Sequence, residues 1–208
     1  GRGDRPGAGP GRRRPERRLM ARRGLSRAVV TETAGRLADR DGYDALTLGA
    51  VAAELGVRPP SLYNHVDGLP GLRRSLALQG LAELGVAIRD AAVGRAGDDA
   101  LAALAEAYRD YAGRRPGVYP ALQRAPEPGD AELAAAGERL LAPVFAVLAG
   151  YGLRDTAAIH AARALRSAMH GFVELERAGG FGIDLDVAAS YRWMVTAFSA
   201  GLRSQAPG

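Results

Sequence analysis

The segment from residue 47 to residue 65 constrains the fold most, because it combines an apolar helical repeat with a glycine and two consecutive prolines. Thr47 is a favourable N-cap for a first helix. Gly56 stands just after that helix's last apolar position, where a left-handed residue often ends a helix. Pro59 can begin a second helix but cannot lie inside one. The apolar residues of the first helix recur at helical spacing: Leu48, Val51, Ala52 and Leu55.

Two short helices joined by a tight turn form a helix-turn-helix, whose second helix enters the major groove of DNA. Arg58 can reach a phosphate or a guanine edge, and Asn64 can read adenine. Pro59 and Pro60 offer only apolar surface, which suits a thymine methyl group. Donors for backbone phosphates come from Ser61, Tyr63 and His65. An alternative for Tyr63 is a packed aromatic ring, and core packing is the expectation for Leu62.

Residues 52 to 66, Ala-Ala-Glu-Leu-Gly-Val-Arg-Pro-Pro-Ser-Leu-Tyr-Asn-His-Val, resemble the DNA-binding signature of TetR-family transcriptional regulators. The resemblance implies that Tyr63 and His65 contact phosphates, and that Thr47 caps a helix whose N-terminus faces the DNA backbone. Two positions depart from the family pattern. Val66 stands where an aromatic residue is usual, and Gly68 stands where a phosphate-binding lysine is frequent.

The composition predicts an all-helical protein, since the chain of 208 residues is rich in alanine, leucine and glycine and lacks alternating strand patterns. It contains no cysteine, which excludes disulfides and thiolate metal sites. No apolar run reaches the roughly 18 residues of a membrane span. The N-terminus also lacks the apolar core of a signal peptide. We therefore expect a cytoplasmic protein without a membrane segment.

Charge divides the chain into three predicted regions. Residues 1–24 hold nine arginines against two acids, residues 25–75 hold six of each, and residues 76–208 hold 13 arginines and 15 acids. We interpret them as a basic arm, a helix-turn-helix domain, and a helical ligand-binding and dimerisation domain. The arm either follows DNA phosphates, through Arg22 and Arg23 first of all, or is a disordered extension. A third reading makes Met20 the natural start.

About nine helices are expected, which is the family's layout of a three-helix head and a six-helix body. After the head they cover about residues 69–92, 98–114, 116–123, 130–148, 155–178 and 186–202. The resemblance implies dimerisation through the last two, whereas periodicity alone also allows their apolar stripes to face the chain's own core. The predicted interface comprises Ile159, Leu165, Tyr191, Met194, Val195, Phe198 and Leu202. Residues 161 to 182 further resemble a C-terminal subtype with a Trp-x-x-x-His-Gly pattern, although Arg166 stands in place of the tryptophan.

A regulator of this type requires an effector site in the body. We expect an apolar pocket that binds a small, neutral, largely apolar molecule. The effector would move the helix beginning near Leu69, change the separation of the two heads and release a palindromic operator. Each candidate is also a plausible core residue. The candidates are Tyr108, Tyr111, Tyr119, Phe145, Tyr151, Met169, His170 and Phe172.

Enzyme chemistry has little support in the sequence. Ser26 half-matches a nucleophile elbow but is better explained as a helix N-cap. His160 and His170 are too far apart on one helix to share a metal, and no third ligand joins His170 and Glu174. We expect neither a cofactor nor a metal. The alternative to a repressor is a helical ligand- or partner-binding protein that has lost specific operator recognition.

Overall fold

The computed structural model describes residues 24–205, and these form only helices and connecting loops. The prediction of an all-helical protein with a helix-turn-helix head is confirmed. All nine predicted helical segments are present within these residues, seven as α-helices and two as short 3₁₀ helices. Arg22 and Arg23 lie outside the described residues, so the basic arm remains a prediction.

The head contains α2 (Arg27–Asp41), α3 (Leu48–Leu55) and the 3₁₀ helix η1 (Pro59–Asn64). Ser26 caps α2, because its hydroxyl accepts a hydrogen bond from the Val29 amide at 3.3 Å. A small core joins the three elements and includes Val30, Val51 and Leu62, all of which are fully buried. The head therefore buries one side of each short helix and leaves the other sides to solvent.

The body contains α4 (Gly68–Ala92), α5 (Gly97–Arg114), the 3₁₀ helix η2 (Tyr119–Leu122), α6 (Ala131–Gly150), α7 (Asp155–Arg177) and α8 (Val187–Ser204). Helix α5 packs against α4, α6, α7 and α8. Its inward residues, such as Leu101, Leu104 and Tyr111, are almost completely buried. This central helix therefore organises the larger core.

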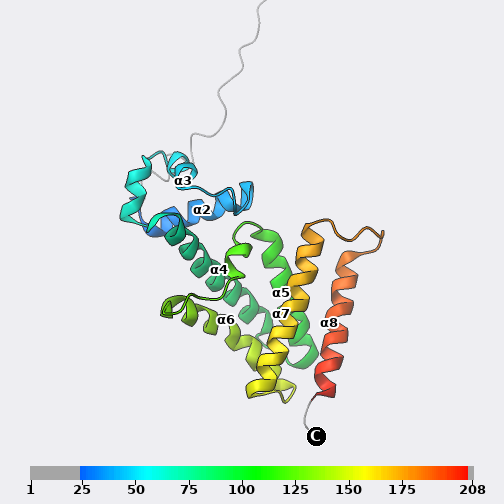
Figure 1. Cartoon of the computed structure of the whole chain (residues 1–208). Coiled ribbons are helices and arrows are strands. Elements are labelled where there is room, and N and C mark those ends of the chain that lie inside the picture. Colours follow the sequence, from blue (N-terminus) through cyan, green and yellow to red (C-terminus); the bar gives the residue numbers. More distant parts are fainter. Residues whose placement is uncertain (1–23, 206–208) are drawn as a thin grey trace, which may run out of the picture.

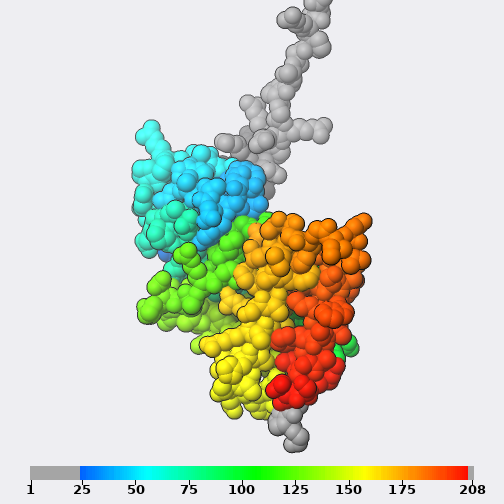
Figure 2. All heavy atoms as spheres, turned by 45° about the vertical axis from the view of Figure 1, so that its right-hand side comes forward, coloured from blue at the N-terminus to red at the C-terminus, as the bar shows by residue number. Residues whose placement is uncertain are grey.

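Helix α4 is the structural link between the two parts (Figure 1). It begins directly after η1, contacts α2, and then runs into the body against α5 and α6. The space-filling view shows the head as a lobe above the body (Figure 2). The predicted domain boundary at residue 75 falls inside this continuous helix, so the division into domains remains a proposal. One continuous helix therefore joins the head to the body.

Asp130 and Asp186 both act as helix N-caps, at α6 and α8 respectively. Asp98, the first residue of the predicted helix 98–114, lies in the first turn of α5, and Ala96 is the N-cap residue. The Asp98 carboxylate accepts a hydrogen bond from the Tyr151 hydroxyl at 2.7 Å and pairs with Arg203. It therefore joins α5 to the ends of α6 and α8, a tertiary role that local capping preferences do not reveal.

Candidate functional site

The turn between α3 and η1 has the geometry that the sequence predicts. The Thr47 hydroxyl accepts a hydrogen bond from the Ala50 amide at 3.1 Å, which caps α3. Gly56 adopts the left-handed conformation at φ 70°, and its amide returns to the carbonyls at the end of α3. A side chain at this φ is disfavoured, so glycine allows the sharp change of direction.

The second helix of the motif is a 3₁₀ helix of six residues, which corrects the expectation of an α-helix. Its hydrogen bonds join residues three apart, from Ser61 to Arg58 at 2.9 Å and from His65 to Leu62 at 2.9 Å. Pro59 and Pro60 supply no amide hydrogen, so the first turn contributes few helical hydrogen bonds. A short segment of this kind is typical of 3₁₀ geometry.

Within η1 one residue is buried and most of the others are exposed. Leu62 is fully buried, as predicted, whereas Tyr63 keeps 61% of its surface. The core-packed alternative for the Tyr63 ring is therefore not what the structure shows. Ser61 and His65 are half-buried. The other predicted DNA contacts that the structure describes are exposed: Thr47, Arg58, Pro59, Pro60 and Asn64.

Two arginines distinguish this surface electrostatically. Within the described residues the Arg58 guanidinium has no ion pair or side-chain hydrogen bond, and it stands at the start of η1. Arg27 donates from Nε to the His65 carbonyl at 3.1 Å and so connects α2 to the end of η1. Arg27 was not singled out from the sequence, because the 38 residues that separate it from His65 conceal the contact.

A second cluster joins the head to the body at the end of α5. The Asp39 carboxylate of α2 accepts hydrogen bonds from the amides of Gly117 at 2.9 Å and Val118 at 3.1 Å. The Arg115 Nε lies 3.2 Å from Asp39 and 3.5 Å from the Glu83 carboxylate of α4. A Cβ atom on Gly117 would lie 1.8 Å from the Ala38 carbonyl oxygen. The absence of that atom allows the two backbones to meet.

The same connecting segment continues into α7 through buried hydroxyl groups. The Tyr119 hydroxyl lies 2.6 Å from the Tyr108 hydroxyl and 2.7 Å from the His170 Nδ1. Arg177 donates to the Pro116 carbonyl at 2.7 Å. Burial raises the pKa of Tyr119 and of Tyr108, so both phenols stay protonated at neutral pH. The segment from residue 115 to residue 123 thus contacts α2 on one side and α7 on the other.

An open groove of about 700 Å³ lies between α4 and α6. None of the eight predicted effector residues lines it; Phe145 lines a smaller cavity of about 410 Å³ near the start of α7. Four of the eight instead have hydroxyl or ring nitrogen atoms in core hydrogen bonds: Tyr108, Tyr111, Tyr119 and His170. Tyr151 bonds Asp98, Met169 is buried, and Phe172 packs on Tyr191 with ring centroids 5.0 Å apart.

Large aromatic side chains fill much of a helical core, and here Tyr108, Tyr119 and His170 hydrogen-bond one another within it. The role of the eight candidates in effector binding stays a prediction. The groove is lined instead mainly by small and aliphatic residues. Such residues carry no chemical signal in a sequence, because alanine, valine and leucine occur throughout this chain.

The last two helices present a different face from the one predicted for dimerisation. Tyr191, Val195 and Leu202 of α8 are buried in the chain's own core, as is Leu165 of α7. Met194 and Phe198 are half-buried, and Ile159 is 42% exposed. The buried members are correctly apolar but face inward, so they are unavailable to a second chain. Their opposite faces are exposed: Ala164, Ser167, Gly171 and Leu175 of α7, and Ala189, Trp193, Ala197 and Ala200 of α8.

The described residues contain no group of three or more potential metal ligands. Helix α6 is the one described helix that is long and apolar enough to cross a membrane, with a mean hydropathy of 1.5 and 22% of its best window buried. Length and composition alone support that possibility, and α6 packs against α4, α5 and α7 in this fold. Its apolar character is therefore accounted for in part by these neighbours and in part by the groove.

Two family models match the chain. Residues 30–65 match the model described as bacterial regulatory proteins, tetR family, and residues 101–198 match the tetracyclin repressor-like C-terminal domain. The uncharacterized HTH-type transcriptional regulator Rv0681 of Mycobacterium tuberculosis is 44% identical over 86% of this chain and 82% of its own length. The uncharacterized HTH-type transcriptional regulator YobS of Bacillus subtilis is 35% identical over 88% of this chain and 96% of its own length.

Solved structures share the fold. A protein of unknown function from Rhodococcus sp. RHA1 aligns with a TM-score of 0.70 and 24% identity, covering 89% of this chain and 97% of its own. A TetR variant from Acinetobacter baumannii AYE, solved in complex with minocycline, aligns with a TM-score of 0.68 and 19% identity, covering 88% and 99%. The arrangement of head, linking helix and body is therefore shared with both proteins.

Proposed function

Because the chain belongs to the TetR family of bacterial regulatory proteins, and is a DNA-binding transcriptional regulator, we propose that it acts as a homodimeric repressor. The dimer binds a palindromic operator and leaves it when a small, largely apolar effector enters the body. One observation carries this proposal most directly: α4 runs without interruption from the exposed helix-turn-helix to the groove against α6. A ligand in the body can thus change the position of the head.

In this proposal the DNA is held mainly through its backbone. Tyr63, His65 and Thr47 contact phosphates, and Arg58 adds a positive charge that no described acid neutralises. Base readout rests on Asn64 and on the apolar surface of Pro59 and Pro60. So few specifying side chains imply that DNA shape contributes to recognition. The outer faces of α7 and α8, with Trp193 on α8, form the dimer contact.

The coupling between the two sites follows the elementary thermodynamics of linkage. An effector shifts the protein only by its difference in affinity between the DNA-bound and the released conformation. The two heads of a dimer must match half-sites about 34–36 Å apart, or a multiple of that distance. A small rotation of α4 in each chain changes this separation, and it also strains the Asp39 contacts with residues 117 and 118.

A fluorescence-anisotropy titration tests the proposal on DNA from around the protein's own gene. An unrelated duplex of equal length, a salt series, and chains beginning at Gly1 and at Met20 run in parallel. We expect specific binding at least about a thousandfold tighter than binding to the control duplex. Equal, salt-labile binding to both duplexes that disappears in the Met20 chain would assign all binding to the arginine-rich arm. That result would favour a ligand- or partner-binding protein, once other genomic sites had also failed.

A further inference from the structure

We infer that the groove between α4 and α6 binds a small amphipathic anion, with an apolar chain along the groove and a carboxylate held by arginines. This inference rests on the proposed function and names the chemical class of its effector. It differs from the neutral ligand expected from the sequence, because Arg89 and Arg139 are 50 residues apart in the chain and line the same groove only in the fold.

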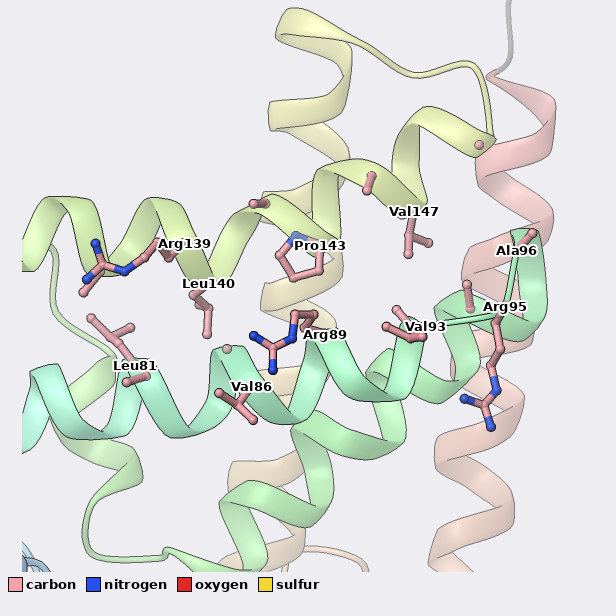
Figure 3. Close-up of a pocket in the computed structure, with 18 of the residues that line it drawn as sticks. Leu81, Val86, Arg89, Val93, Arg95, Ala96, Arg139, Leu140, Pro143 and Val147 are labelled. Atoms are coloured by element: carbon pink, nitrogen blue, oxygen red, sulfur yellow. The ribbon is translucent and has the colours of Figure 1, made fainter.

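Most of the residues that α4 and α6 contribute to the groove are apolar. Side chains of α4 and α6 face each other across it, and the pair Val93 and Val147 is visible at one end (Figure 3). The lining of α4 extends from residue 81 to residue 93, which is about 18 Å of helix. A volume of about 700 Å³ lies in the range of small-molecule sites. An extended aliphatic chain therefore fits its length and its chemistry.

The shape of α6 opens this space. Pro143 lies inside the helix and has no amide hydrogen to donate to the Arg139 carbonyl, which interrupts the helical ladder at this point. At Gly85 the two helices come close, since a Cβ atom there would lie 3.5 Å from the Leu140 Cα. Beyond that contact the ring of Pro143 faces the groove above Arg89 (Figure 3). The interruption and the close contact together make a shaped groove.

The charges of the groove are all of one sign. Three arginines line it, and none of its lining residues is acidic. Arg139 has no ion pair or side-chain hydrogen bond within the described residues. Arg89 bonds only the adjacent Asp90, with both nitrogens sharing one carboxylate oxygen at 3.0 and 2.9 Å. Arg95 bonds the Ala91 carbonyl and points away from the groove in Figure 3.

Arginine recognises a carboxylate through two parallel hydrogen bonds, which are stronger than bonds between neutral groups. Arg139 is available for such a pair, and Arg89 can exchange part of its contact with Asp90 for a ligand. A neutral apolar molecule would offer no hydrogen-bond acceptor to Arg139, which has no protein partner within the described residues. The arrangement therefore selects an amphipathic anion over a neutral molecule of the same shape.

Isothermal titration calorimetry with decanoate tests the inference on the full chain. We expect one decanoate per chain, with binding about fourfold weaker for each methylene removed from the ligand. Methyl decanoate should bind roughly tenfold to a hundredfold more weakly, because it has no charge for arginine. Arg139→Gln should weaken decanoate binding by a similar factor. Ala146→Trp, at an exposed alanine of the lining, should abolish binding by filling the groove.

The matched control is Arg124→Gln, which removes the same charge from an exposed loop outside the groove. It should leave decanoate binding unchanged, and circular dichroism should show that all variants fold. The inference is overturned if decanoate does not bind, if Arg124→Gln weakens it as much as Arg139→Gln, or if the methyl ester binds equally well. It is also overturned if Ala146→Trp converts a dimer to a monomer in sedimentation, since the groove would then hold a second copy.

Adding decanoate to the operator complex separates this inference from the proposed function. Release of DNA by decanoate, lost in Arg139→Gln, supports both. Binding in calorimetry without release overturns the effector role while the DNA-binding proposal stands. Failure to find an operator overturns the proposed function, and calorimetry still decides whether the groove is an anion site.

Discussion

At the scale of single residues, the head depends on a few side chains that separate packing from recognition. Leu62 is fully buried and holds η1 against the head, whereas its neighbour Tyr63 is 61% exposed. This alternation within one short turn explains how six residues can both fold and contact DNA. Arg58 lies at the start of the same turn, and its positive charge is available to DNA because no described acid pairs with it.

Arg58→Gln should weaken DNA binding to specific and unrelated duplexes alike if the side chain contacts a phosphate. The dependence of log K on log salt should then become shallower by about one unit. Anisotropy titrations at several salt concentrations measure both quantities. The control is Arg124→Gln, which should change neither. A loss confined to the specific duplex would assign Arg58 to a guanine edge instead.

Asp130 contributes to the free energy of unfolding in a way that depends on pH. It accepts three hydrogen bonds, two from the Arg74 guanidinium at 2.6 Å each and one from the Leu133 amide at 3.0 Å. The hydrogen bond from Arg74 lowers the pKa of Asp130 from 3.8 to about 2. Because the folded pKa is the lower one, this contribution to stability is complete above about pH 5 and is lost as the pH falls towards 2.

Asp130→Asn should therefore reduce the free energy of unfolding at pH 7 and change it much less near pH 2. Urea denaturation at several pH values measures the difference between the variant and the parent. Glu132→Gln alters a more exposed partner of the same arginine and should have a smaller effect. An effect of Asp130→Asn that is constant with pH would mean that packing, and not charge, explains its role.

At the scale of the elements, the segment between α5 and α6 is more than a connection. It meets α2 through Asp39, α4 through Arg115 and Glu83, and α7 through Tyr119 and His170. Its contact with α2 depends on the small size of Gly117. A connection that contacts three helices limits how far the head can move relative to the body. It is also a second structural connection between the head and the body, in addition to α4.

Gly117→Ala should destabilise the protein by about 1–3 kcal/mol, because the added carbon would meet the Ala38 carbonyl and force two backbones apart. Chemical denaturation measures this loss. Gly113→Ala is the matched control, since a Cβ atom there meets nothing within 4 Å on the exposed side of α5. That control should be neutral or stabilising by up to about 1 kcal/mol. Equal stability of the two variants would contradict the close contact.

At the scale of the whole molecule, we expect two chains to form a dimer through the exposed face of α7 and α8. Trp193 is 74% exposed on α8, among alanines that permit close approach of a second chain. Trp193→Arg should therefore convert the dimer to a monomer in sedimentation velocity. Operator affinity should fall strongly, because one head alone cannot bind two half-sites.

Val93→Arg provides the comparison, since Val93 is an apolar residue of similar exposure, 68%, but lies in the groove of α4 and α6. This variant should remain dimeric. A dimer that survives Trp193→Arg and dissociates in Val93→Arg would move the interface from α7 and α8 to the groove.

The sequence by itself determined the local structure of this protein. Caps such as Ser26, Thr47 and Asp186, the turn at Gly56 and the apolar periodicities act within a few residues of one another, so they predict helices directly. The exposed recognition surface followed from the same local motif. The family resemblance supplied the order of head and body, which the periodicities alone could not.

Only the tertiary structure decided which apolar stripe faces inward and where the cavity lies. Tyr191 and Trp193 are two residues apart, yet one is buried and the other exposed, because the packing of α8 on α5 and α7 sets the rotation of the helix. Arg89 and Arg139 are 50 residues apart in the chain, and they line one groove because α4 packs on α6. Interactions over such separations depend on the shape of the folded chain, and no local pattern records them.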